Sequence, residues 1–134
     1  MANSVHVMKM CAAFAKNGHE VTLIAQDNCQ SEFEIKDDYQ YYGVDPTFEI
    51  IKLKAFHGKY GRNRYAIETL KHVFRLNPDL VYGRFLFGCL IAAKIARKRV
   101  VFEIHVPKTS KSENRFFNIL IHSSHLVRLV VITT

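Results

Sequence analysis

A carboxylate and an imidazole stand two residues apart at the end of one apolar stretch of this sequence. The stretch is RVVFEIHVPK, residues 99–108, in which Glu103 and His105 interrupt the apolar run before Pro107 ends it. The apolar part is typical of a buried strand, and burying either polar group without a partner is costly. Ionisable groups in such places often belong to binding or catalytic sites. We therefore take Glu103 and His105 as candidate catalytic residues.

Arg84 occupies the corresponding place in another apolar stretch, LVYGR, residues 80–84. An arginine guanidinium forms paired hydrogen bonds with phosphate, and equally with any carboxylate. Arg84 and His105 are accordingly candidate substrate-binding residues. Structural alternatives stay open at this point, because His105 could be a core histidine bonded to backbone and Glu103 could simply pair with a basic neighbour.

Strands and helices are expected to alternate along the chain and to position these side chains. Short apolar runs predict strands at residues 19–25, 48–53, 80–84 and 126–134, and a further strand in the stretch 99–108, which Pro107 ends. Helical spacing of apolar residues predicts helices at residues 4–16, 63–76, 85–97 and 113–124, with Asn3 or Ser4 capping the first. The acidic segment 27–47 reads as turns, with its tyrosines in a packed loop.

Uninterrupted apolar strands that alternate with helices indicate an α/β fold: a Rossmann-like, doubly wound parallel sheet with helices on both faces. Ligands of such sheets bind outside the carboxyl ends of the strands. Arg84, Glu103 and His105 all follow or end strands, so we expect them at this binding edge.

Length and composition exclude several classes of protein. A chain of 134 residues, 49% of them apolar, fits one domain with its own core. No apolar run is long enough for a membrane span and no leader peptide is recognisable, so we expect a cytoplasmic protein. Neither a disulfide framework nor a metal site is expected from the three widely spaced cysteines, Cys11, Cys29 and Cys89, or from His122 and His125, which lack an evident third ligand.

The charge is unevenly distributed. Residues 1–50 hold three Lys/Arg and eight Asp/Glu, whereas residues 51–134 hold sixteen and four. A basic half suits an anionic partner, which could be nucleotide phosphates, an anionic lipid surface or nucleic acid. Solvated helix faces explain the same charges equally well.

Four segments together resemble the N-terminal domain of family 4 glycosyltransferases, which are two-domain enzymes of the GT-B fold. The resemblance covers Ser4 to Thr134, and the segments are SVHVMKMCAAFAKNGHEVTLIA, YYGVDPTFEIIKL, DLVYGRFLFGCLIAAKIA and VVFEIHVP. It implies a hexosyltransferase-type activity that retains the anomeric configuration and needs neither a metal nor a cofactor. The N-terminal domain would hold the acceptor and the C-terminal domain the nucleotide-sugar.

The resemblance also implies roles for the three candidate residues. His105 matches the family's histidine that contacts the donor sugar in the cleft between the domains. Arg84 matches a basic residue at the end of the preceding strand, and Glu103 matches a position that is often acidic.

Two departures from the family pattern concern the ends of the chain. The family begins with a strand and a glycine-rich loop, and here only three residues precede the first helix. The donor-binding domain is also absent, so residues 1–134 are expected to form one partial domain that is inactive alone. Without the first strand, we expect one of three outcomes: its two neighbouring strands pair directly, another segment takes its place between them, or the isolated chain is loosely folded.

Three functions follow as hypotheses. The first is the acceptor-side domain of a glycosyltransferase, with a nucleotide-sugar and a glycan or lipid-linked acceptor as substrates and with contact to the anionic inner face of a membrane. The second is a non-catalytic partner subunit, with the donor-binding domain on another chain. The third, a basic nucleic-acid-binding domain, is disfavoured because aromatic and basic residues do not interleave.

Overall fold

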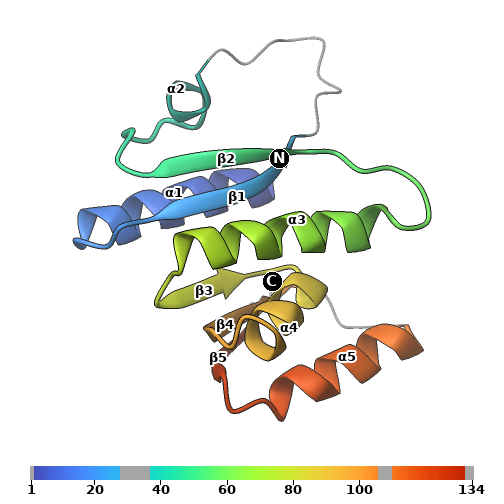
Figure 1. Ribbon diagram of the computed structural model, residues 1–134. Helices are drawn as coiled ribbons and strands as arrows, with labels where there is room; N and C mark the ends of the chain where they lie inside the picture. Colours follow the sequence, from blue (N-terminus) through green and yellow to red (C-terminus); the bar gives the residue numbers. More distant parts are fainter. Residues whose placement is uncertain (1, 28–36, 106–109, 132–134) are drawn as a thin grey trace. The chain divides into compact units, whose positions relative to one another are not determined.

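The computed structural model describes residues 2–27, 37–105 and 110–131, which alternate between helices and parallel strands (Figure 1). The chain forms two compact units, residues 1–55 and 56–134, and each is described by itself. The predicted α/β class is confirmed. Cys29, Pro107 and the end of the last predicted strand lie outside the described residues. None of the helices in the described part of the chain has the length and apolar character that a bilayer crossing requires.

The first unit contains two helices and a two-stranded sheet. These elements are α1 (Ala2–Lys16), β1 (Thr22–Asp27), α2 (Asp38–Tyr42) and β2 (Glu49–Lys54). The strands are parallel, with Thr22 opposite Glu49. Met8, Cys11 and Phe48 are buried at the centre of this unit, where Tyr39 donates a hydrogen bond of 2.6 Å to the carbonyl oxygen of Phe48. The interpretation of Cys11 as a core residue is confirmed.

Two local predictions in this unit are wrong. The first helix begins at Ala2, so Ser4 lies inside its first turn and does not cap it. The acidic segment contains α2, which begins after Asp37, whose carboxylate accepts hydrogen bonds from the Tyr39 and Gln40 amides. Gly43 ends this helix with a positive φ of 63°, which glycine adopts without strain. A helix of five residues is too short to show apolar periodicity, so only its two caps could have revealed it.

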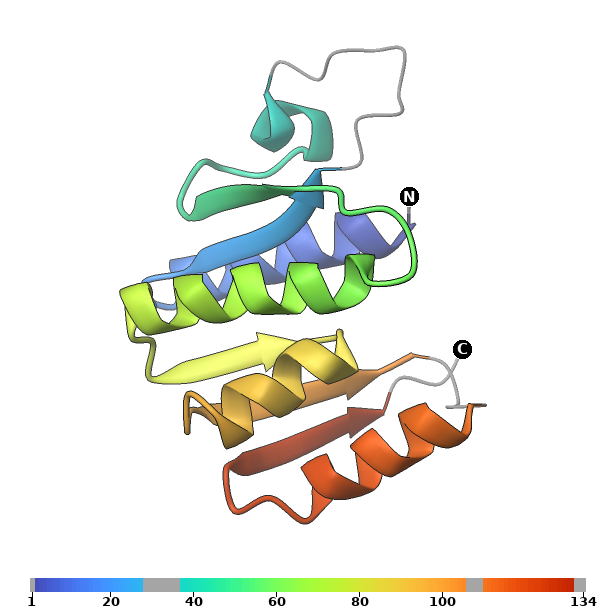
Figure 2. The same ribbon diagram turned by 45° about the vertical axis from the view of Figure 1, so that its right-hand side comes forward.

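In the described part of the second unit, three helices accompany three parallel strands in the order β3-β4-β5. Its elements are α3 (Gly61–Leu76), β3 (Leu80–Gly83), α4 (Leu86–Lys94), β4 (Arg99–Ile104), α5 (Lys111–Ile121) and β5 (Leu126–Val131). Figure 2 shows α4 and α5 along one face of this sheet. The central strand β4 pairs with β3 on one side, where Phe102 lies opposite Gly83, and with β5 on the other, where Ile104 lies opposite Val131.

Alternation along β4 separates its apolar residues from its polar end. Val100 and Phe102 are fully buried against α4 and α5, in a core that includes Leu90 and Leu120. Successive side chains of a strand point to opposite faces, so Val101 and Glu103 belong to the other face. The sequence of β4 therefore places core-packing apolar side chains on one face of the sheet and a carboxylate on the other.

Helix boundaries in this unit differ from the prediction by a few residues. The helix α4 ends at Lys94, and Arg97 follows with a left-handed φ of 53°, which stops the helix before its predicted end. The helix α5 begins earlier than predicted because Ser110 caps it. The Ser110 hydroxyl accepts a hydrogen bond of 3.1 Å from the Glu113 amide, as in a capping box.

Within each unit, the described strands form one parallel sheet. Among the described residues, β1 pairs only with β2, and β3 pairs only with β4. The sequence predicted that β1 and β3 would flank a further strand, and the two belong to different units. Which of the three expected outcomes applies to these strands stays a prediction.

Gly83 allows α4 to pack closely against the end of β3. A Cβ atom added at Gly83 would overlap the sulfur of Cys89, which is 2% exposed. Burial raises the pKa of the Cys89 thiol to about 12, so the group is an uncharged core side chain at neutral pH. This contact fixes the backbone just before Arg84.

We predict that Gly83→Ala destabilises the second unit by about 1–3 kcal/mol, because the added methyl group overpacks this contact. Denaturant unfolding measures the change. The same substitution in a Cys89→Ala background should cost clearly less, since the opposing sulfur is gone. An equal cost in both backgrounds would show that the contact with Cys89 is not the cause.

Candidate functional site

The three candidate residues meet at the carboxyl ends of two neighbouring strands. Arg84 directly follows β3, Glu103 is the fifth residue of β4, and His105 directly follows β4. Because β3 and β4 are adjacent and parallel, their carboxyl ends lie at the same edge of the sheet. The expected clustering is confirmed, whereas the catalytic and binding roles of these residues stay predictions.

The Glu103 carboxylate is the centre of the cluster. Arg84 Nε lies 3.1 Å from Glu103 Oε1 and forms an ion pair with it. His105 Nε2 contacts the same oxygen and also contacts Arg84 Nη2. The alternative in which His105 is bonded only to backbone does not apply, because both of its contacts are side chains.

Tyr82 is a fourth member of the cluster that the sequence reasoning missed. Its phenol donates a hydrogen bond to Glu103 Oε2. Tyr82 is paired with Val101 across the two strands, and alternation then places it on the face that carries Glu103. The available signal was a hydroxyl-bearing aromatic residue two positions before Arg84 in an otherwise apolar strand.

The neighbours of Glu103 keep its carboxylate ionised. The residue is only 1% exposed, and burial alone would raise its pKa. The hydrogen bonds from Tyr82 and His105, together with the positive charge of Arg84, outweigh burial and lower the pKa below its ordinary value. Burial and the hydrogen bond to Glu103 conversely raise the pKa of Tyr82 to about 12, so its phenol remains a donor.

Accessibility divides the cluster into an outer and an inner part. The side chains of Arg84 and His105 are 19% and 26% exposed, whereas that of Glu103 is 0% exposed. Arg84 and His105 are therefore accessible to a ligand, whereas Glu103 is not. A guanidinium beside an imidazole suits a phosphate or a sugar hydroxyl. Among the described residues, no group of His, Cys, Asp and Glu side chains could hold a metal ion.

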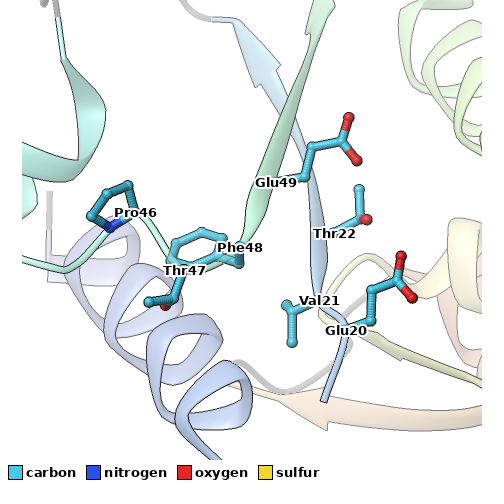
Figure 3. A pocket seen from close by; sticks show the side chains of 7 residues that line it. All are labelled: Glu20, Val21, Thr22, Pro46, Thr47, Phe48 and Glu49. Atoms are coloured by element: carbon cyan, nitrogen blue, oxygen red, sulfur yellow. The ribbon is translucent and has the colours of Figure 1, made fainter. Parts of the chain in front are cut away.

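A hollow of about 380 Å³ lies elsewhere, at the amino ends of β1 and β2 in the first unit (Figure 3). Glu20 and Glu49 lie on one side of it, and Phe48 lies on the other. The hollow is at the strand ends opposite to those where sheets of this class bind ligands. Two acidic side chains would also repel phosphate, so the hollow is not the candidate site.

The lowered pKa of Glu103 predicts a pH dependence of stability. A carboxylate whose pKa is depressed on folding stabilises the protein above its unfolded value, here near 4.5, and this contribution is lost as the pH falls through the folded value. We expect Glu103→Gln to lower the free energy of unfolding at pH 7 by roughly 1–3 kcal/mol. The difference between the two proteins should shrink steadily below pH 4.5.

Denaturant unfolding between pH 3 and pH 7 checks this, with Glu68→Gln as the matched control. Glu68 forms an ion pair with Lys71 three residues along α3, and such surface pairs contribute little. A difference between wild type and Glu103→Gln that stays constant across this pH range would contradict the assignment of an ionised Glu103.

Comparison with known proteins places the chain in a family. The model of a family described as Glycosyltransferase Family 4 matches residues 4–134. Comparisons with curated proteins and with solved structures give no match. The family match extends over nearly the whole chain, including both units and the Tyr82–Arg84–Glu103–His105 cluster. The protein therefore belongs to glycosyltransferase family 4.

Proposed function

We propose that this chain is the acceptor-side domain of a retaining glycosyltransferase, which transfers a sugar from a nucleotide-sugar to a glycan or a lipid-linked acceptor. Family membership supports glycosyl transfer as the reaction class. The observation that carries the proposal is the pairing of a partly exposed imidazole and guanidinium with a buried, ionised carboxylate at the carboxyl edge of a parallel sheet.

Each residue of the cluster has a distinct role in this proposal. His105 forms a hydrogen bond with a hydroxyl group of the donor sugar and orients it for transfer. The Arg84 guanidinium offsets the negative charge that develops on the departing nucleotide phosphate. Glu103 holds both side chains in place, because its Oε1 atom contacts Arg84 Nε and His105 Nε2.

A buried carboxylate suits this supporting role better than proton transfer. A general acid or base works best with a pKa near the operating pH, and the pKa of Glu103 is displaced in the opposite direction. Glu103 therefore stays ionised throughout the reaction in this proposal. It contributes by holding the two donors in one geometry before the substrate arrives.

The first test is His105→Ala in the protein assayed together with a donor-binding domain, supplied on the same chain or separately. We expect kcat/KM for transfer from the nucleotide-sugar donor to fall roughly 30- to 1000-fold. This corresponds to about 2–4 kcal/mol of lost transition-state stabilisation. Folding should persist, because His105 follows the last residue of β4 and is partly exposed.

The matched control is His122→Ala, which removes a histidine from the end of α5, where its Nδ1 donates to the carbonyl oxygen of Asn118. Its kcat/KM should equal that of the wild type. Unchanged transfer by His105→Ala would overturn the proposed role. Nucleotide-sugar binding without any transfer, even with the donor-binding domain present, would favour a non-catalytic partner subunit.

A further inference from the structure

The two oxygens of the Glu103 carboxylate have separate partners. Oε2 accepts the hydrogen bond from Tyr82, and Oε1 contacts Arg84 and His105. Tyr82 approaches Oε2 from β3. Its bond to Oε2 therefore fixes the rotation of the carboxylate, so that Oε1 is turned toward the side chains that can reach a ligand.

The contacts of His105 Nε2 select one protonation pattern. This nitrogen touches an acceptor, Glu103 Oε1, and a donor, Arg84 Nη2, and it cannot satisfy both at once. Arg84 already has Glu103 Oε1 as an acceptor, at 3.1 Å from its Nε. A proton on Nε2 would form a charge-assisted hydrogen bond with the carboxylate, which is stronger than a neutral one. Nε2–H facing Glu103 is therefore the favoured arrangement.

This pattern determines which nitrogen is left for a ligand. With Nε2 protonated and bonded to Glu103, a neutral His105 has its lone pair on Nδ1. Within the described part of the chain, the contacts of His105 with Arg84 and Glu103 both use Nε2 and leave Nδ1 unused. A hydroxyl group of the substrate can thus donate to Nδ1.

We propose that Tyr82 is a positioning residue, which acts through Glu103 to hold His105 in the Nε2–H tautomer with Nδ1 as the acceptor for a sugar hydroxyl. The use of Nδ1 by a sugar rests on the proposed function, whereas the link between Tyr82, Glu103 and His105 does not. Loss of the phenol leaves Oε2 without its donor and weakens the preference of the carboxylate for its ionised form.

Nuclear magnetic resonance tests the link in the full chain without any ligand. The ¹³C signal of the Glu103 carboxyl reports its titration, and the two ring ¹⁵N signals of His105 report its tautomer. In the wild type we expect Glu103 to titrate below its ordinary range and neutral His105 to carry its proton on Nε2. In Tyr82→Phe, Glu103 should titrate at a higher pH than in the wild type, because its ionised form has lost one hydrogen bond.

Tyr39→Phe is the matched control, because it also removes a phenol that donates a hydrogen bond, in this case to the backbone oxygen of Phe48 in the first unit. Tyr39→Phe should lower the free energy of unfolding and leave the Glu103 and His105 signals unchanged. This separates a general effect of losing a phenol from the positioning effect of Tyr82. Glu103→Gln provides a second variant, in which the population of the Nε2–H tautomer should fall.

Two results would overturn the proposal: a proton on Nδ1 of neutral His105 in the wild type, or an unchanged Glu103 titration in folded Tyr82→Phe. The wild-type measurement decides the tautomer even if Tyr82→Phe does not fold. The NMR outcome is independent of transfer. The expected tautomer together with unchanged activity of His105→Ala would therefore reject the proposed function and retain the positioning link.

Discussion

The ionised carboxylate of Glu103, buried at the end of β4, is the constraint that organises the second unit. A charge removed from water needs several donors close by, and the chain supplies them from three places. Tyr82 donates from the neighbouring strand β3, Arg84 from the residue after β3, and His105 from the residue after β4. An apolar residue of similar volume would stabilise the sheet about as well, so stability alone does not account for this arrangement.

The cluster depends on the register of β4 as much as on its sequence. Val100 and Phe102 are fully buried on the face that α4 and α5 cover, and Glu103 belongs to the opposite face. A shift of one residue would exchange the two faces, which would place the carboxylate under the helices and expose Phe102. The hydrophobic core therefore specifies the position of the Glu103 carboxylate, although the core and the carboxylate lie on opposite faces of the sheet.

The sequence predicts much of this fold and part of its site, for reasons that particular residues make clear. Apolar runs and helical spacing are local signals, and they located all five strands and the longer helices. The clustering of Arg84, Glu103 and His105 followed from one general property of parallel sheets. Tyr82 was missed because its contact with Glu103 depends on which strands are neighbours and in which register, and no local pattern contains that information.

The contact between Gly83 and Cys89 also allows local opening at this edge of the sheet to be followed by chemical labelling of the Cys89 thiol. The Cys89 thiol is 2% exposed and its pKa is about 12, so the folded protein presents almost no thiolate to an alkylating reagent at neutral pH. Labelling requires α4 to separate from β3, next to the backbone that carries Arg84. The rate of Cys89 labelling therefore measures how often α4 separates locally from the end of β3 that precedes Arg84. Global equilibrium unfolding does not resolve this local opening.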